Sequence, residues 1–183
     1  MLIREMSRDE CLQVLAETKI ARLACAFKNQ PYVVPVYLAY FQSAGGESCL
    51  YGFTTLGQKV EWMRANPLVC VEVDKIDAVD QWVSVVVFGQ YQELPPVLAQ
   101  NVGRLPHRET TESPEELPIA PALAGEQLVA YQLLQSRAMW WEPATTARAA
   151  SVHRHVADPV IPIFYKIGID QVTGHQSTRV PAE

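Results

Sequence analysis

Alternation of apolar and polar positions dominates the first half of the chain and predicts β-strands. Five segments show this pattern: residues 20–27 (IARLACAF), 32–41 (YVVPVYLAYF), 48–53 (SCLYGF), 68–74 (LVCVEVD) and 82–94 (WVSVVVFGQYQEL). The polar turns KNQP and SAGGE connect the first three segments, as in hairpins. Because the connections are short and the period is near two, we expect an antiparallel barrel rather than alternating β-α-β units.

Two helices are predicted within this strand-rich part. Ser7 followed by Glu10 forms a capping box in front of a short apolar face, which predicts the first helix. Thr55 and Gln58 repeat this spacing. We therefore expect the second helix to begin at Thr55 and to end before Pro67.

The chain is interpreted as a single domain over residues 1–183, with a core barrel in residues 1–94. Residues 95–158 are interpreted as a helical and loop insertion, because six of the 13 prolines and an acidic patch fall near its start. Within it we expect a short helix near Val97–Leu105 and an amphipathic helix over residues 125–141. Residues 159–174 return to strand character as a sixth strand, and the tail after Gly174 is expected to fray.

Composition excludes several function classes. The 183 residues are 49% hydrophobic and 19% charged, as in soluble globular proteins, and the net charge of −5 argues against a large nucleic-acid surface. No apolar run reaches the ~20 residues of a membrane span. The start, MLIREMSRDECLQ, is too charged for a signal peptide, so we expect a cytoplasmic protein that binds neither nucleic acid nor membrane.

Cysteine and histidine spacing does not indicate a metal site. No C-x-x-C pair occurs, and buried small hydrophobes are the favoured interpretation of Cys11, Cys25, Cys49 and Cys70. His153 and His155 alternate as ligands on a strand do, but a solvated loop is favoured because no cysteine lies nearby. Trp140 and Trp141 are interpreted as core or interface residues, with stacking against the ring system of a cofactor as the alternative.

An anion site is the main chemical hypothesis for residues 51–67. A helix beginning near Thr55 gathers free backbone N–H groups at its positive end, where a phosphate is stabilised. Gly57 leaves room for that phosphate, and Lys59 lies one turn beyond Thr55 on the same face. The alternative is a capped surface helix with a solvated lysine.

Three further positions stand out, each with two interpretations. Pro35 interrupts a strand, which leaves neighbouring backbone groups free for a planar heterocycle or marks an ordinary sheet edge. Ser84 shares a strand face with Trp82 and Phe88, where its hydroxyl contacts either a ligand or nearby backbone. Arg22 reaches either an anionic group or solvent.

Three blocks occur in order between about Ser7 and Leu94: ARLACAFKNQPYVVPVYLAY, LYGFTTLGQKVEWMRANPLVCVEVD and WVSVVVFGQYQEL. Their order and spacing resemble the FMN-binding split-barrel proteins related to pyridoxamine 5′-phosphate oxidase, and more closely the nitroimidazole-reductase-like flavoproteins. The resemblance implies a mainly β fold, a six-stranded antiparallel split β-barrel with peripheral helices. Beyond Leu94 the match is loose.

The resemblance also implies an FMN site and its residues. The isoalloxazine ring would contact the backbone of Val34, Pro35, Val36 and Tyr37, and the ribityl chain would cross Phe53, Thr54 and Thr55. The phosphate would sit at the helix start, held by Gln58 and Lys59, and the polar side chain of Ser84 would lie near the ring edge. Such proteins are usually homodimers with FMN at the subunit interface.

The chain also departs from its relatives. Phe53 stands where the nitroimidazole-reductase-like branch often has a substrate-linked histidine. Gln58 and Lys59 stand where the pyridoxamine phosphate oxidases have an arginine-lysine pair, and no C-terminal substrate-binding arginine and histidine can be aligned. We therefore do not expect oxidation of pyridoxamine phosphate.

The expected function is an FMN-dependent oxidoreductase that passes reducing equivalents from a reduced nicotinamide to a small acceptor. No catalytic residue can be assigned. The alternative is a flavin- or haem-binding carrier or sensor without turnover.

Overall fold

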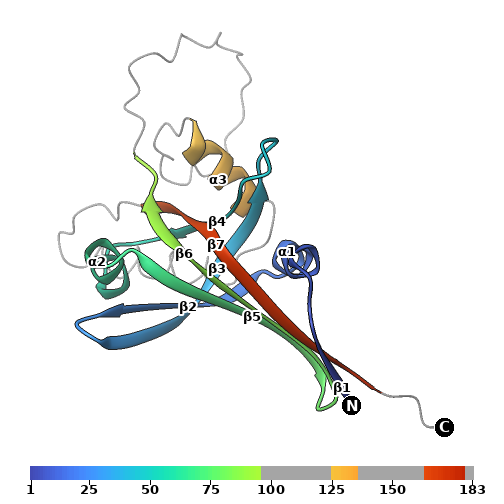
Figure 1. The fold of residues 1–183 in the computed structure, drawn as a ribbon. Coiled ribbons are helices and arrows are strands. Elements are labelled where there is room, and N and C mark those ends of the chain that lie inside the picture. The colour runs from blue at the N-terminus through green and yellow to red at the C-terminus, as the bar shows by residue number, and fades with distance from the viewer. Residues whose placement is uncertain (96–124, 136–162, 180–183) are drawn as a thin grey trace, which may run out of the picture.

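The computed structural model describes residues 1–95, 125–135 and 163–179 (Figure 1). In these ranges the chain forms seven strands and three helices. Their order is β1 (Leu2–Glu5), α1 (Arg8–Glu17), β2 (Ile20–Phe27), β3 (Gln30–Gln42), β4 (Ser48–Thr54), α2 (Gln58–Ala65), β5 (Leu68–Ala78), β6 (Gln81–Glu93), α3 (Glu126–Gln135) and β7 (Ile163–Thr178). None of these helices has the length and apolar character that a membrane span requires.

The strands form one antiparallel sheet that closes on itself. Their order is β1-β7-β4-β3-β2-β5-β6, and a further pairing of β7 with β6 closes the barrel (Figure 1). Strands β2 to β7 therefore form the expected six-stranded barrel, and the mainly β fold class is confirmed. The expected hairpin turns are also present, with Lys28 and Asn29 at positive φ between β2 and β3.

Strand β1 was not predicted from the sequence. Within the described ranges it pairs only with the end of β7, from Leu2 opposite Thr178 to Glu5 opposite His175. All four of its residues are exposed, so no alternation marks it as a strand.

The last strand is longer than expected. The sequence placed its end at Gly174 and a frayed tail after it, but β7 runs from Ile163 to Thr178. The prediction was wrong because the tail is paired on both sides: residues 175–178 meet β1, and residues 175–177 also meet the start of β6. The predicted helix near Val97–Leu105 and the end of the helix over residues 125–141 lie outside the described residues.

The barrel interior is filled by inward-facing apolar side chains. On β6, Val85 and Val87 are buried while Phe88 is 48% exposed, which confirms the two-faced strand expected from the sequence. Cys11 and Cys25 are buried as expected, whereas Cys49 and Cys70 are half-buried. The largest fully buried side chains include Tyr165, Leu23, Met63, Ile167 and Val71.

A second apolar cluster lies outside the barrel, beneath α3. Ala130 and Leu134 of this helix pack against outward-facing residues of β3, β4 and β7, including Tyr37, Tyr51 and Phe164. The side-chain amide of Gln127 donates to the carbonyl of Leu94 at 2.9 Å. Helix α3 thus covers the outer face of the barrel where these three strands meet (Figure 1).

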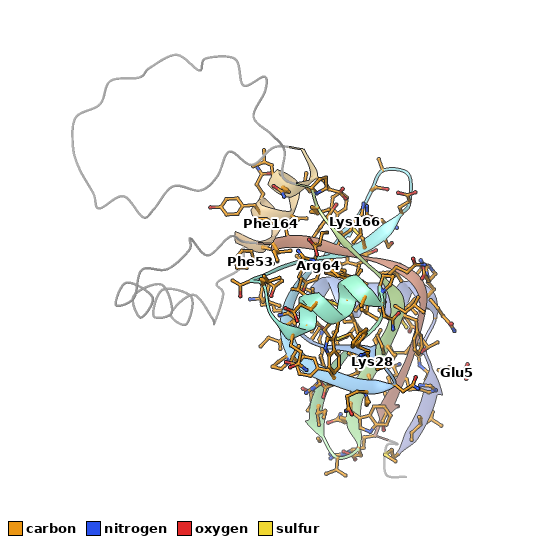
Figure 2. All side chains as sticks on the ribbon, turned by 90° about the vertical axis from the view of Figure 1, so that its left-hand side faces the viewer. Glu5, Lys28, Phe53, Arg64, Phe164 and Lys166 are labelled. Carbon is orange, nitrogen blue, oxygen red and sulfur yellow. The ribbon has the colours of Figure 1, made fainter. Side chains whose placement is uncertain are left out.

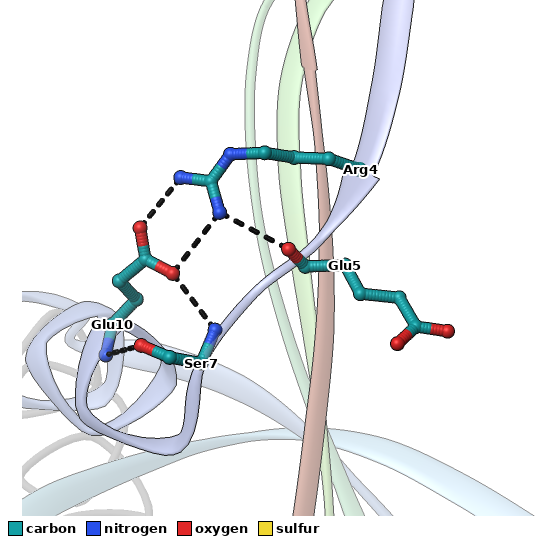
Figure 3. A network of polar contacts seen from close by, with 4 residues as sticks. All are labelled: Arg4, Glu5, Ser7 and Glu10. Carbon is teal, nitrogen blue, oxygen red and sulfur yellow. Dashed lines mark hydrogen bonds and ion pairs between the residues drawn. The ribbon is translucent and has the colours of Figure 1, made fainter.

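Helix α1 begins with the expected capping box (Figure 3). The amide of Glu10 donates to Ser7 Oγ at 3.3 Å, and the amide of Ser7 donates to Glu10 Oε2 at 2.7 Å. The guanidinium of Arg4 donates to both carboxylate oxygens of Glu10. Strand β1 and helix α1 are therefore tied together at one point.

Helix α2 begins later than expected. The sequence placed its start at Thr55 with a second capping box, but the helix runs from Gln58 and its cap is Gly57, without a side-chain cap hydrogen bond. The prediction was wrong because the chain turns between Thr55 and Gly57 before it becomes helical. Val60 and Met63 anchor the helix in the interior, and Asn66 ends it, donating to the carbonyl of Ala26 at 2.9 Å.

Candidate functional site

The ladder between β3 and β4 stops partway along both strands. Their pairing runs from Gln42 opposite Ser48 to Leu38 opposite Gly52 and ends there. Before Leu38, residues 30–37 of β3 pair only with β2; after Gly52, the last residues of β4 pair only with β7. Among the described strands, the backbone edge of β3 up to Val36 and that of β4 from Phe53 therefore have no strand partner on the sides that face each other across this opening.

The open edge of β3 carries the predicted residues Val34–Tyr37. Val34 and Val36 belong to the interior cluster, and Tyr37 belongs to the outer cluster under α3. Pro35 is exposed and pairs with Arg22 of β2. A ligand at this edge would therefore meet backbone groups and the Pro35 ring, which fits the expectation of backbone contacts.

The open edge of β4 carries Phe53 and Thr54. Phe53 is half-buried against Phe164 of β7, with ring centroids 5.4 Å apart, and Phe164 in turn meets Tyr131 of α3 at 6.3 Å. Figure 2 shows Phe53 and Phe164 together near α3. Sequence reasoning missed Phe164 and Tyr131, although Tyr131 lay on the apolar face of the predicted amphipathic helix.

Three residues, 55–57, separate the end of β4 from the start of α2. The amide of Val60 donates to the carbonyl of Gly57 at 2.9 Å. By helix geometry the amides of Gln58 and Lys59 come before this bond and point out of the helix end. Thr55 is half-buried, and Gln58 is exposed. The end of α2 therefore offers free donors beside the opening, as expected for a phosphate site.

Lys59 is the cation of this region. Its side chain is half-buried, and this burial lowers the pKa of the ammonium, an effect that the nearby Cys25 thiol partly opposes. Within the described part of the chain no carboxylate lies within ion-pair distance of Lys59. A bound anion would stabilise the charged form of this partly desolvated ammonium.

Arg64 fixes α2 on the barrel. Its guanidinium makes two parallel hydrogen bonds to Glu93 of β6, of 2.6 and 3.0 Å, and Tyr91 donates to the same carboxylate at 3.0 Å. Figure 2 marks Arg64 on α2. The arginine lowers the pKa of Glu93, so the carboxylate stays ionised and the bidentate pair holds the orientation of the helix.

Ser84 lies apart from the other predicted residues within one chain. It is on β6, opposite Asp74, and its hydroxyl donates to Glu72 Oε1 at 3.3 Å. Pro35 and Ser84 are on strands separated by three steps in the order β3-β2-β5-β6, roughly 14 Å at ordinary strand spacing. Both side chains face outward, but β3 and β6 are three strands apart in either direction around the six-stranded ring, so one chain does not bring them together.

Arg22 of β2 forms ion pairs with two carboxylates of the neighbouring strand β5. Its guanidinium donates to Glu72 at 2.8 Å and to Asp74 at 2.5 Å. Of the two interpretations of Arg22, the geometry favours the surface role, because its charge is balanced without a ligand. Trp140, Trp141, His153 and His155 lie outside the described residues.

The comparisons with known proteins agree with this architecture. The profile of the family described as pyridoxamine 5′-phosphate oxidase matches residues 7–116. An uncharacterized protein of Rhizobium meliloti (strain 1021) is 34% identical over 174 residues, which is 95% of each chain. A crystal structure of a FAD-binding protein from Mesorhizobium loti is 32% identical, with a TM-score of 0.62 over 98% of this chain and 99% of that one.

Two more distant structures share the fold. The FAD-binding protein of Mycobacterium smegmatis is 17% identical, with a TM-score of 0.50 over 94% of this chain and 98% of that one. A candidate 5-nitroimidazole antibiotic resistance protein of Bacteroides thetaiotaomicron is 12% identical, with a TM-score of 0.54 over 96% of this chain and 89% of that one. The split-barrel architecture is therefore shared across this group.

Proposed function

Because the chain belongs to the pyridoxamine 5′-phosphate oxidase family, we propose that it is a flavoprotein that binds FMN and transfers electrons to a small acceptor. One observation carries the proposal: the opening between β3 and β4 leads directly to the start of α2, where Lys59 is desolvated. The FAD-binding name of the Mesorhizobium loti relative supports a flavin as the ligand.

Each part of the opening suits one part of the flavin. Lys59 and the first amides of α2 would hold the phosphate, with the Thr55 hydroxyl and the Gln58 amide as further donors. The backbone of residues 34–36 would bond the edge of the ring system, and Phe53 would cover the ribityl side. When bound, FMN supplies the redox chemistry, while the chain binds it, orients it and excludes water.

FMN is preferred over FAD for a physical reason. A terminal phosphate carries more negative charge than the linking phosphates of a dinucleotide, and Lys59 with the end of α2 is suited to such a compact anion. Extraction of the cofactor from the purified chain, followed by chromatography against FMN and FAD standards, tests this preference. FAD alone in the extract would contradict it.

A homodimer is part of the proposal. The outer face of β3, β2, β5 and β6 carries a row in register, Val33–Ala24–Cys70–Phe88, in which Val33 is 57% and Phe88 48% exposed. Large exposed apolar side chains on the outer face of a sheet favour association. In such a dimer Ser84 would face the flavin held by the other copy, which accounts for its distance from residues 53–59.

The test of function is spectroscopic. We expect the purified chain to be yellow with FMN absorbance, and NADH or NADPH to bleach it under anaerobic conditions before an acceptor restores the colour. A yellow protein that neither nicotinamide reduces would instead be a carrier or sensor. A colourless protein with no affinity for FMN would refute the proposal, and a Soret band would indicate haem.

A further inference from the structure

Helix α3 lies where β3 and β4 separate. The last pair of their ladder is Leu38 opposite Gly52, and the next residues toward the opening are Tyr37 on β3 and Phe53 on β4. Tyr37 belongs to the apolar cluster beneath α3, and Phe53 packs against the same cluster. Because α3 contacts both strands through this cluster, it covers the point at which the opening begins.

The apolar contacts of α3 lead to the open edge of β4. Ala130 and Leu134 are 0% and 2% exposed, so this face of the helix is fully packed on the barrel. Tyr131 of the same helix meets the ring of Phe164 on β7, and that ring meets Phe53. Figure 2 shows Phe53 and Phe164 beside α3. A movement of α3 would therefore be felt at the edge that borders the proposed flavin.

Polar contacts fix the first turn of α3. Lys166 Nζ on β7 and the Tyr51 hydroxyl on β4 both donate to Oε1 of Glu126, each at 2.8 Å. Burial alone would raise the pKa of Glu126, but Lys166 and Tyr51 lower it, so the carboxylate stays ionised. The next side chain, Gln127, donates to the carbonyl of Leu94 just beyond β6. The helix is thus tied to β4, to β7 and to the end of β6.

The end of a strand ladder moves unless something fixes it. If the ladder gained the pair Tyr37–Phe53, it would occupy the first backbone groups of the opening, and if it lost a pair the opening would widen. Packing of both side chains in the cluster under α3 opposes both changes. The width of the opening therefore depends on α3 staying in place.

We propose that α3 is a clamp that keeps the opening at the width that binds the flavin, and that Glu126 is a positioning residue of this clamp. The inference rests on the proposed flavin function, because the clamp has a use only if the opening holds the ring. Detachment of α3 should release FMN faster. Since coupling of this kind is reciprocal, bound FMN should in turn hold α3 on the barrel.

Hydrogen exchange of the full chain, with and without FMN, tests this reciprocity. We expect FMN to slow exchange of the amides of residues 130–135 by about threefold more than it slows those of α1, which serve as the internal reference for general stabilisation. Mass spectrometry of peptides from the two helices gives both rates. Equal slowing of the two helices would overturn the clamp.

A charge on the buried face of α3 tests the clamp directly. Ala130→Glu should detach the helix and speed the release of FMN by roughly tenfold, because its carboxylate cannot stay buried in the apolar cluster. Gln132→Glu is the matched control, since it adds the same charge on the exposed face of the same helix. Release is followed by the fluorescence of free FMN after dilution, and thermal melts verify that the barrel is folded.

Milder variants test the role of Glu126. Glu126→Gln and Lys166→Met each remove the ion pair and should each speed release by about threefold. The double variant should release FMN no faster than either single variant, because all three lack the same interaction. These variants keep the apolar face intact, so they also decide the matter if Ala130→Glu does not fold.

The outcomes separate the clamp from the proposed function. An unmodified chain that binds no FMN would refute the proposed function and the clamp with it. If the unmodified chain binds FMN, release at the ordinary rate from a folded Ala130→Glu chain or from Glu126→Gln would overturn the clamp alone.

Discussion

At the scale of single residues, Lys59 joins the fold to the proposed chemistry. It occupies the second position of α2 and is half-buried beside the Cys25 thiol. A buried ammonium without a carboxylate destabilises a free protein and stabilises a complex with an anion. Substitutions at this position should therefore have opposite effects on stability and on binding.

Lys59→Met should weaken FMN binding by about 1.5–3 kcal/mol, the range for hydrogen bonds to charged groups, or roughly ten- to a hundredfold in Kd. The same change should raise the melting temperature of the flavin-free chain, because it removes a desolvated charge. Fluorescence titration and thermal melts measure the two effects. Lys75→Met is the control. An FMN affinity of the Lys59 variant equal to that of the unmodified chain would show that Lys59 does not bind the phosphate.

The pH dependence has a defined sign. Burial lowers the pKa of folded Lys59 below that of the unfolded chain, so between the two pKa values the unfolded state binds more protons. Stability of the flavin-free chain should thus rise with pH in this alkaline window relative to Lys59→Met. FMN affinity should fall in the same window, because the ammonium is lost. Urea melts and titrations at a series of pH values record both slopes.

Tyr165 offers a prediction independent of ligands. Its ring is fully buried next to Tyr91, and its hydroxyl has no hydrogen-bond partner in the described part of the chain. Gly52 lies against this ring, where a Cβ would overlap it. Tyr165→Phe should be neutral or stabilising by up to about 1 kcal/mol, since it removes an unpaired polar group, whereas Gly52→Ala should destabilise by about 1–3 kcal/mol. Urea denaturation compares the two, and a strongly destabilised Tyr165→Phe would reveal a missing partner.

At the scale of elements, the start of α1 is the best-defined junction. Ser7→Ala removes one half of the capping box and should destabilise the chain by about 1 kcal/mol.

Arg4 and the amide of Ser7 hold the pKa of Glu10 at about 2. A lowered carboxyl pKa gives stability that is present above the unfolded value and is lost as the pH falls toward about 2. The free energy of unfolding of the unmodified chain should exceed that of Glu10→Gln at pH 6. This difference should disappear as the pH is lowered to 2, as measured by denaturation at a series of pH values.

The sequence predicted elements well where burial imposes a period. Strand β2 begins and ends as expected, because its inward positions, such as Ala21, Leu23 and Cys25, are all buried. The prediction from sequence failed where a strand is held by backbone pairing without buried side chains, as in β1 and in residues 175–178. It also failed at Thr55, because a capping spacing does not guarantee that the backbone is already helical.

The candidate site was partly predictable for the same reason. The resemblance identified residues that the structure brings to two facing edges, Val34–Tyr37 and Phe53–Thr54. No local pattern could reveal that Phe164 and Tyr131 complete this region, because their contacts join segments distant in the sequence. Ser84 reaches the flavin only in the proposed dimer, so neither the strand pattern nor the structure of one chain tests its predicted role.

At the scale of the whole molecule, the exposed row on the sheet predicts association. Phe88→Arg should convert the proposed dimer into a monomer, because a charge would be buried at the centre of the interface. It should weaken FMN binding as well if the second copy contributes to the site. Light scattering coupled to size-exclusion chromatography measures the mass. As a control, Val79→Arg alters a side chain that is 94% exposed in the turn between β5 and β6.

Strand β7 meets three others, β1, β4 and β6, and enters the sheet only after the rest of the barrel has been synthesised. Contacts so distant along the chain are slow to form, because a long loop must close before they are rewarded. Strand β7 should therefore close the barrel last, and a variant that ends at Leu94 should be cleaved by proteases faster than the full chain, because β4 and β6 then lack their shared neighbour.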